Sequence, residues 1–277
     1  MNIVGLGHAG CQIAKNFKEY QQYNVFCVDI ENKKYPKFLK VKEQKTHESY
    51  EKNYKKLNFD KCKGPTTLIL SGAGKISGCC LRILEQLKEN EITILYIKSD
   101  TMQLSSAAAA HERSTFGVLQ QYARSALFSK MYIVANNNVE KIIEDISLKN
   151  YWVDINHIIS STYHMVNVFK NTEPLLSNQA HSKETARIST MGVVNYETSK
   201  EKLFYDLQYP RTRKYFYGLA SDTTESDKDT LHNIRKFVEG RSGENINSGF
   251  SLYSTNYSNN YVYSEHCASF IQEQIVE

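Results

Sequence analysis

Two glycine-rich turns constrain this 277-residue chain more than any other feature. The segments 5–10 (GLGHAG) and 72–78 (GAGKISG) each follow an apolar, strand-like run and precede a helix-like run. Glycine lets the backbone turn tightly and approach a ligand, and the following helix directs unpaired N–H groups and a partial positive charge at an anion. The two turns together predict a phosphate-bearing ligand that is held from two sides.

The first half of the chain alternates between strand-like and helix-like segments. Strands are predicted over residues 2–5, 24–30, 66–70, 92–97 and 131–135, and helices over residues 10–20, 78–89 and 112–127. Alternation of this kind is typical of an α/β fold with a parallel sheet and helices on both faces. We therefore expect a Rossmann-like nucleotide-binding domain over residues 1–146.

The second half of the chain has a different residue pattern. An apolar-periodic stretch over 145–169 predicts one long helix, a central core helix placed within 147–172. Beyond Pro174 the segments 187–196, 215–219, 249–257 and 260–267 are rich in Tyr, Ser and β-branched residues, and a helix is predicted over 227–239. Residues 173–277 are therefore expected to form a smaller, mixed α/β C-terminal domain.

Composition narrows the class of protein. The chain is 41% apolar, no apolar run approaches the ~20 residues that cross a membrane, and the N-terminus has no secretory pattern. Six scattered cysteines lack C-x-x-C spacing and predict reduced core thiols and no metal site. Lysines crowd residues 33–63 but alternate with acidic residues, so a solvated face is favoured and direct nucleic-acid binding is not predicted. We expect a cytoplasmic protein with no membrane partner.

The first turn alone also fits a second class of protein. Gly5-x-Gly7-x-x-Gly10 after a strand, with Asp29 closing the next strand, matches the dinucleotide-binding fingerprint of NAD(P)-dependent oxidoreductases. That reading leaves the second turn unexplained and provides no evident acid or base for hydride transfer. A P-loop is set aside because Ile76 follows Gly74-Lys75 where Ser or Thr should hold magnesium, and Ile69 replaces its first glycine.

Taken together, the turns resemble the tubulin/FtsZ family, whose signature loop has the form G-G-G-T-G-S/T-G. The segment 7–13 (GHAGCQI) is similar to the tubulin run G-Q-C-G-N-Q-I, and the segment 154–162 (DINHIISST) looks like D-L-N-H-L-V-S-A-T of the tubulin core helix. The chain departs from the signature at Ala73, Lys75 and Ile76. The resemblance extends to about residue 190, implies a tubulin/FtsZ-like fold, and points to the small phage, plasmid or divergent prokaryotic members.

This resemblance implies a site for GTP or GDP. Asn156 would pair with the guanine edge while Trp152, one helical turn earlier, stacks on the purine. Asn136 would be a second base-reading amide, Gln12 lies near the base in the family, and Glu112, at the expected start of its helix, is a candidate for the ribose hydroxyls. The expected nucleotide-binding residues are Gly7, His8, Ala9, Gly10, Gln12, Gly72, Ala73, Gly74, Lys75, Ile76, Ser77, Gly78, Glu112, Asn136, Trp152 and Asn156.

The loop after the core helix bears on hydrolysis. In the family it resembles L-N-x-D-x-x-D/E and carries carboxylates that orient water at the neighbouring subunit's γ-phosphate. Here Asn178 fits, but the two carboxylate positions fall on Ala180 and Lys183. Alanine cannot polarise water and a protonated lysine cannot act as a base, so Asn178 and Glu184, the latter one residue out of register, are left as the catalytic candidates.

The resemblance therefore implies a guanine-nucleotide-binding protein with Mg²⁺ on the phosphates, assembling head to tail into filaments, with weak or absent hydrolysis. A possible adaptor protein is left open as a further partner. Two alternatives stay open beside it: the Rossmann-type oxidoreductase, and a non-polymerising interaction or scaffold protein that keeps the fold while nucleotide use has decayed.

Overall fold

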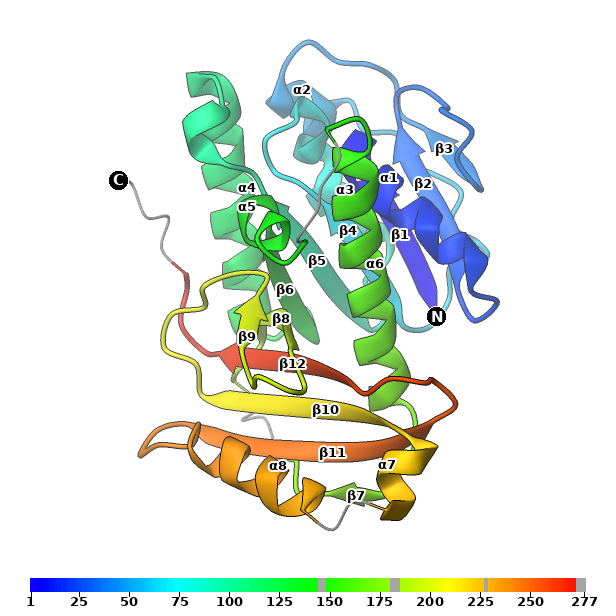
Figure 1. Ribbon diagram of the computed structural model, residues 1–277. Coiled ribbons are helices and arrows are strands. Elements are labelled where there is room, and N and C mark those ends of the chain that lie inside the picture. The colour runs from blue at the N-terminus through cyan, green and yellow to red at the C-terminus, as the bar shows by residue number, and fades with distance from the viewer. Residues whose placement is uncertain (144–147, 180–184, 227–228, 273–277) are drawn as a thin grey trace.

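The computed structural model describes residues 1–143, 148–179, 185–226 and 229–272 (Figure 1). These residues form one 12-stranded sheet with helices on its faces. The strands are β1 (Asn2–Leu6), β2 (Asn24–Asp29), β3 (Phe38–Lys40), β4 (Thr66–Leu70), β5 (Ile92–Lys98), β6 (Lys130–Ala135), β7 (Leu176–Ser177), β8 (Ile188–Val194), β9 (Glu201–Leu203), β10 (Thr212–Ala220), β11 (Asn247–Thr255) and β12 (Tyr261–Ala268).

Eleven helical segments connect or follow the strands in the described part of the chain. The α-helices are α1 (Gly7–Ala14), α2 (His47–Lys52), α3 (Cys80–Gln86), α4 (Ser106–Arg124), α5 (Asn136–Glu140), α6 (Tyr151–Lys170), α7 (Ser221–Ser226) and α8 (Thr230–Glu239). Three 3₁₀ segments are η1 (Lys15–Glu19), η2 (Lys75–Cys79) and η3 (Thr101–Gln103).

The sheet changes character along its strand order. The six strands β3-β2-β1-β4-β5-β6 are parallel. β8 continues the sheet in parallel through two residue pairs, Met131 with Ile188 and Tyr132 with Ser189. Beyond it, β12 is antiparallel to both neighbours, and β10 and β11 run parallel. The prediction of an α/β fold with a Rossmann-like parallel sheet followed by a mixed C-terminal part is confirmed, while its division into separate domains stays a prediction.

Alternate side chains of the central strands supply two cores. On β4, Leu68 and Leu70 pack with α2, α3 and α4, whereas Ile69 points to the face that α1 and α6 cover. All three are fully buried. Strands buried on both faces read as continuous apolar runs, which is why β4 and β6 were readily predicted.

Helix α6 is the predicted core helix. It begins at Tyr151, and residues 144–147, where the predicted stretch began, lie outside the described residues. Ile155, Ile159 and Val166 bury its apolar face against the parallel sheet. At its far end Phe169 stacks on Phe216 of β10 with ring centroids 6.4 Å apart, so α6 packs on both parts of the sheet (Figure 1).

The six cysteines are all buried and none forms a disulfide, which confirms the prediction of free core thiols. Cys11 lies in α1 and Cys27 in β2, Cys62 precedes β4, Cys79 ends η2 and Cys80 begins α3, and Cys267 lies in β12. Burial raises the pKa of the Cys80 thiol to about 12. No helix among the described residues is long and apolar enough to span a bilayer.

Candidate functional site

The carboxyl ends of the parallel strands form one edge of the molecule. Because β1 and β4 are neighbours in register, the turns that follow them leave the sheet side by side. Ser99 follows β5 at the same edge, its hydroxyl 2.9 Å from the hydroxyl of Ser71 after β4, and Asn136 follows β6. This edge is where open parallel sheets bind ligands.

The two glycine turns touch each other. Gly7 has a φ of +70°, a conformation that glycine adopts without strain. A Cβ placed on Gly7 would lie 2.8 Å from the Cγ2 atom of Ile76, so the first turn faces the second directly. Behind them, a Cβ on Gly10 would lie only 2.2 Å from the carbonyl oxygen of Ile69, which brings the start of α1 against β4. The structure thus brings together the two halves of the predicted phosphate site.

The second turn is held by its own hydroxyl. Ser77 is almost fully buried, and its Oγ lies 2.7 Å from the carbonyl oxygen of Gly72 and 2.8 Å from that of Gly74. The 3₁₀ helix η2 begins at Lys75. Gly74 and Lys75 are both exposed. The predicted helix over 78–89 is therefore wrong at its start, since η2 precedes α3.

Glu112 lies beneath the second turn. Its side chain is fully buried, and its Oε2 atom would lie 2.8 Å from a Cβ on Gly72. Burial raises the pKa of this carboxyl. Helix α4 begins at Ser106, after Ser105 caps it by accepting the N–H of Ala108, so the expectation that Glu112 starts its helix is wrong. The Glu112 side chain therefore packs against the backbone of the second turn at Gly72.

Residues of the first turn and of α1 contact Tyr35, which was not predicted from the sequence as a site residue. His8 Nδ1 lies 3.1 Å from the Tyr35 hydroxyl, and Gln12 donates its Nε2 hydrogen to the same oxygen at 3.4 Å. Tyr35 is 6% exposed and follows β2 in the lysine-rich segment. Burial raises the pKa of Tyr35, so the phenol is neutral. Ala9 is exposed on the first turn of α1.

Helix α6 packs beside α1 and η1. Asn16 of η1 donates its Nδ2 hydrogen to Ser160 Oγ in the middle of α6 at 3.1 Å, and α1 and α6 both lead away from the edge with the turns (Figure 1). Gln12 and Asn156 lie four residues before Asn16 and Ser160, nearer to that edge. Asn156 is partly buried. Trp152, one turn before it, is 61% exposed.

Asn136 lies at the same edge but beyond β5. It begins α5 directly after β6 and lines a small cleft of about 190 Å³ together with Ser99 and Asp100. Asn137 donates to the Asp100 carboxylate at 3.2 Å. The amide of Asn136 is therefore accessible from a hollow at the edge of the sheet.

Asn178 lies at the opposite end of the molecule. It follows β7, and its side-chain oxygen accepts the N–H of Phe250 in β11 at 2.9 Å while its own N–H donates to the Phe250 carbonyl. In Figure 1 β7 lies at the bottom and α1 begins at the top. Ala180, Lys183 and Glu184 lie outside the described residues.

A histidine pair at the second turn had no signal in the sequence. His47, the first residue of α2, has its Nε2 atom 3.2 Å from Ser77 Oγ. Its ring stacks on that of His111 in α4, with centroids 4.7 Å apart. Burial and the neighbouring His111 lower the pKa of His47, so this ring is neutral near pH 7. No clustering of three or more metal-ligating side chains is found within the described ranges.

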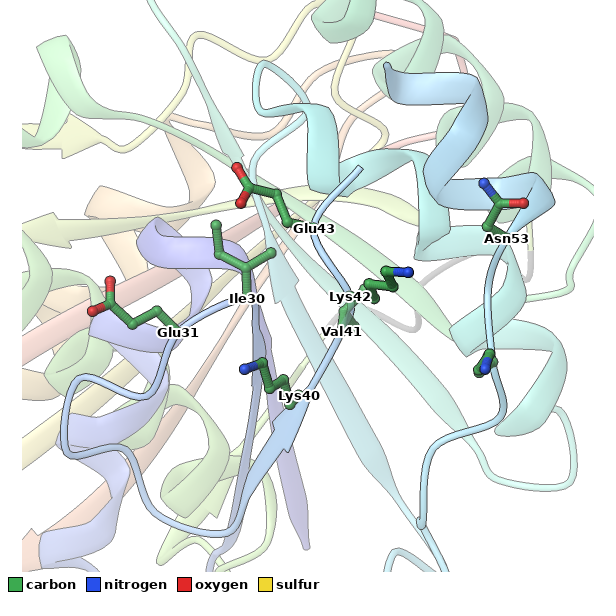
Figure 2. Close-up of a pocket in the computed structure, with 8 residues that line it drawn as sticks. Ile30, Glu31, Lys40, Val41, Lys42, Glu43 and Asn53 are labelled. Atoms are coloured by element: carbon green, nitrogen blue, oxygen red, sulfur yellow. The ribbon is translucent and has the colours of Figure 1, made fainter. Parts of the chain in front are cut away.

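The lysine-rich segment adds a cleft to the same edge (Figure 2). The cleft has a volume of about 640 Å³ and opens where β2 and β3 end, next to Glu31 and Lys40. Lys42, Glu43 and Lys55 also line it. All eleven lysines between residues 33 and 63 are exposed, as a solvated face requires.

No protein-family model matches the sequence, and no curated protein matches it. Solved structures do match it. GDP-form protofilaments of TubZ from Bacillus thuringiensis serovar israelensis give a TM-score of 0.68 at 14% identity, covering 96% of this chain and 88% of TubZ. The GTPγS-bound protofilament of CetZ2 from Haloferax volcanii gives 0.68 at 10% identity, covering 96% and 92%.

FtsZ from M. jannaschii, as an empty dimer, gives a TM-score of 0.65 at 11% identity, covering 96% of this chain and 87% of FtsZ. These three proteins agree with this chain over nearly its whole length, in both the parallel and the mixed part of the sheet. At such low identity the agreement concerns the backbone. The chain therefore has the tubulin/FtsZ-like fold.

Proposed function

We propose that this protein binds a guanine nucleotide at the edge where β1 and β4 end. The observation that carries the proposal is the contact between Gly7 and Ile76, which places two glycine turns against each other in a chain with the tubulin/FtsZ-like fold. Such turns direct backbone N–H groups at phosphate oxygens. Mg²⁺ would neutralise the phosphates, and the exposed Lys75 would reach them from the second turn.

The base would lie toward the start of α6. Asn156 offers a donor and an acceptor to the guanine edge, and Trp152 has enough exposed surface to stack on the ring. Gln12 of α1 would complete this end of the site. Asn136 would contact the base or ribose from the end of β6.

We infer head-to-tail assembly from where Asn178 lies. TubZ and CetZ2 form protofilaments, and in this chain the Asn178 loop and the glycine turns are at opposite ends (Figure 1). Stacked in one direction, subunits would place each Asn178 loop over the next subunit's nucleotide. Ala180 and Lys183 stand where the family carries carboxylates, so turnover would be slow or absent.

The decisive experiment compares nucleotides on two matched variants. Wild-type protein should bind GTPγS in preference to ATPγS and NADH. Asn156→Asp keeps an acceptor but loses the donor, which should cost about 2 kcal/mol, or about thirtyfold in GTPγS affinity. Asn171→Asp makes the same change at the far end of α6 and should leave affinity unchanged.

Fluorescent-nucleotide titration measures each affinity. NADH binding without GTPγS binding would instead identify an oxidoreductase, and equal losses in both variants would remove Asn156 from the site. Light scattering with and without GTP, together with phosphate release, then tests assembly and hydrolysis. GTP binding without any rise in scattering would leave a nucleotide-binding scaffold protein.

A further inference from the structure

A second cavity lies at the end of the parallel sheet opposite the glycine turns. Its volume is about 760 Å³, within the range typical of small-molecule sites. The first residues of β4 and β6, Thr66 and Lys130, line it, and the last turn of α6 closes it with Val168 and Lys170. We call it the sheet-base pocket. None of its lining residues belongs to the proposed nucleotide site.

An ion cluster around a buried carboxylate forms one wall of the sheet-base pocket. Glu265 of β12 is completely buried, and its Oε1 atom accepts from Lys130 Nζ at 2.9 Å and from Lys170 Nζ at 2.5 Å. The Tyr132 hydroxyl donates to the same oxygen and accepts from Lys170 at 2.7 Å. Two ammonium groups thus share one carboxylate, which leaves one positive charge without a counter-charge inside the cluster.

Other charges nearby do not neutralise it. Lys214, opposite Glu265 on β10, adds positive charge. Glu91 lies on the exposed rim of the pocket and forms no ion pair with a described residue. The Lys130 and Lys170 side chains are 17% and 27% exposed, so the excess positive charge is only partly desolvated, and an opposite charge that enters the pocket would stabilise it. In line with this, burial, opposed by Glu265 and assisted by Lys130, lowers the pKa of Lys170 to about 8.

Both lysines also keep donor capacity. An ammonium group has three N–H bonds. Lys170 uses two, toward Tyr132 and Glu265, and Lys130 donates to Glu265 and, at 3.6 Å, to Cys267 Sγ. Each therefore retains one N–H bond for a ligand in the pocket that the two lysines line. Tyr163 and Val168 of α6 also line the pocket and offer apolar contact beside the two lysines.

We propose that the sheet-base pocket binds a small organic carboxylate. Its carboxylate pairs with Lys170 and Lys130, and its apolar body lies against Tyr163 and Val168. The ligand would contact β6, α6 and, through Glu265, β12. It would therefore stabilise the joint between the parallel and the mixed part of the sheet.

The test uses benzoate as probe and benzamide as its uncharged counterpart, titrated calorimetrically near pH 8 in two buffers of different ionisation enthalpy. Benzoate should bind saturably and benzamide at least tenfold more weakly. Pairing raises the pKa of Lys170, so binding should take up about half a proton at this pH. Saturating GTPγS should change neither result, because the glycine turns lie at the other end.

Matched variants locate the probe. Lys170→Met should abolish benzoate binding, whereas Lys18→Met, an exposed lysine on η1, should not affect it. Val168→Trp puts a larger side chain into the pocket and keeps every residue of the ion cluster, so it should also abolish binding, which keeps the test decisive if Lys170→Met fails to fold. Absence of saturable benzoate binding, equal binding of benzamide, or unchanged binding to Val168→Trp overturns the proposal.

Discussion

The contact between α1 and β4 allows one substitution to be predicted in both sign and size. In Gly10→Ala the new Cβ would lie 2.2 Å from the carbonyl oxygen of Ile69 and 3.1 Å from its carbonyl carbon. Both atoms belong to backbone in the middle of the sheet, so no flexible side chain can move aside. Helix α1 has to shift by roughly 1 Å to restore an ordinary contact distance.

The cost follows from overpacking in a close-packed interior. Such changes cost about 1–3 kcal/mol, and a clash between two backbone segments belongs at the upper end, so we expect about 3 kcal/mol. For a chain of this size that lowers Tm by roughly 6–12 °C. Because the shift carries the start of α1 away from the second turn, GTPγS affinity should fall as well.

Gly117→Ala is the matched control. Gly117 lies inside α4, and no atom would lie within 4 Å of its new Cβ. Alanine in an open helix interior is favoured over glycine by about 1 kcal/mol, so Tm should rise by roughly 2–4 °C. Thermal melts followed by circular dichroism, with urea unfolding as a second measure, give both values. A Gly10→Ala protein as stable as wild type would refute the close approach of α1 to β4.

Three further variants test buried polar groups by urea unfolding. Burial lowers the pKa of His164, whose Nδ1 lies 3.1 Å from the Tyr23 hydroxyl. The unfolded chain then binds more protons than the folded chain below about pH 6.5. The free energy of unfolding of wild type should therefore fall more than that of His164→Gln between about pH 7 and pH 5. Parallel curves of unfolding free energy against pH would contradict this. Glu265→Gln removes the fully buried carboxylate that pairs with two partly buried lysines and should cost about 3 kcal/mol; an unchanged free energy of unfolding would contradict this. Gln120→Ala removes two hydrogen bonds with the Gln272 backbone, at 3.1 and 2.6 Å, and should cost about 2 kcal/mol; a loss below about 0.5 kcal/mol would argue against that contact.

The sequence was most informative where burial is complete. The predicted strand over 66–70 coincides with β4, because an apolar run covered on both faces carries an unmistakable pattern. The core helix was recognised from its apolar periodicity, since α6 packs along its length. The contact between the two turns was expected from their glycine-rich sequences, and the pairing of β1 with β4 produces it.

Local hydrogen bonds explain why other element boundaries were predicted wrongly. The helix predicted from residue 78 is preceded by η2, because the Ser77 hydroxyl binds the carbonyl oxygens of the turn and tightens the chain into a 3₁₀ segment. The strand β3 and helix α2 were not predicted within the lysine-rich segment. Their polar composition hides them, although Thr46 caps α2 with a capping box completed by Ser49.

Contacts between segments far apart in the chain produce no periodic pattern in the sequence. His47 reaches Ser77, and Tyr35 reaches His8 and Gln12, only because β2, β3 and α2 fold over the first and second turns. The cluster around Glu265 likewise joins three elements far apart in the chain. A single sequence contains no local signal for such pairs, and only the fold brings them together.

The burial of all six cysteines turns the native thiols into reporters of local opening. A thiol-reactive dye should leave the folded protein unlabelled, since each sulfur is shielded from solvent and burial holds several in the protonated form. Labelling rates at Cys11, Cys79 and Cys267 would then time the release of α1, the second turn and β12 separately. Conversely, one cysteine engineered on the surface would accept a single fluorophore without any native thiol having to be removed.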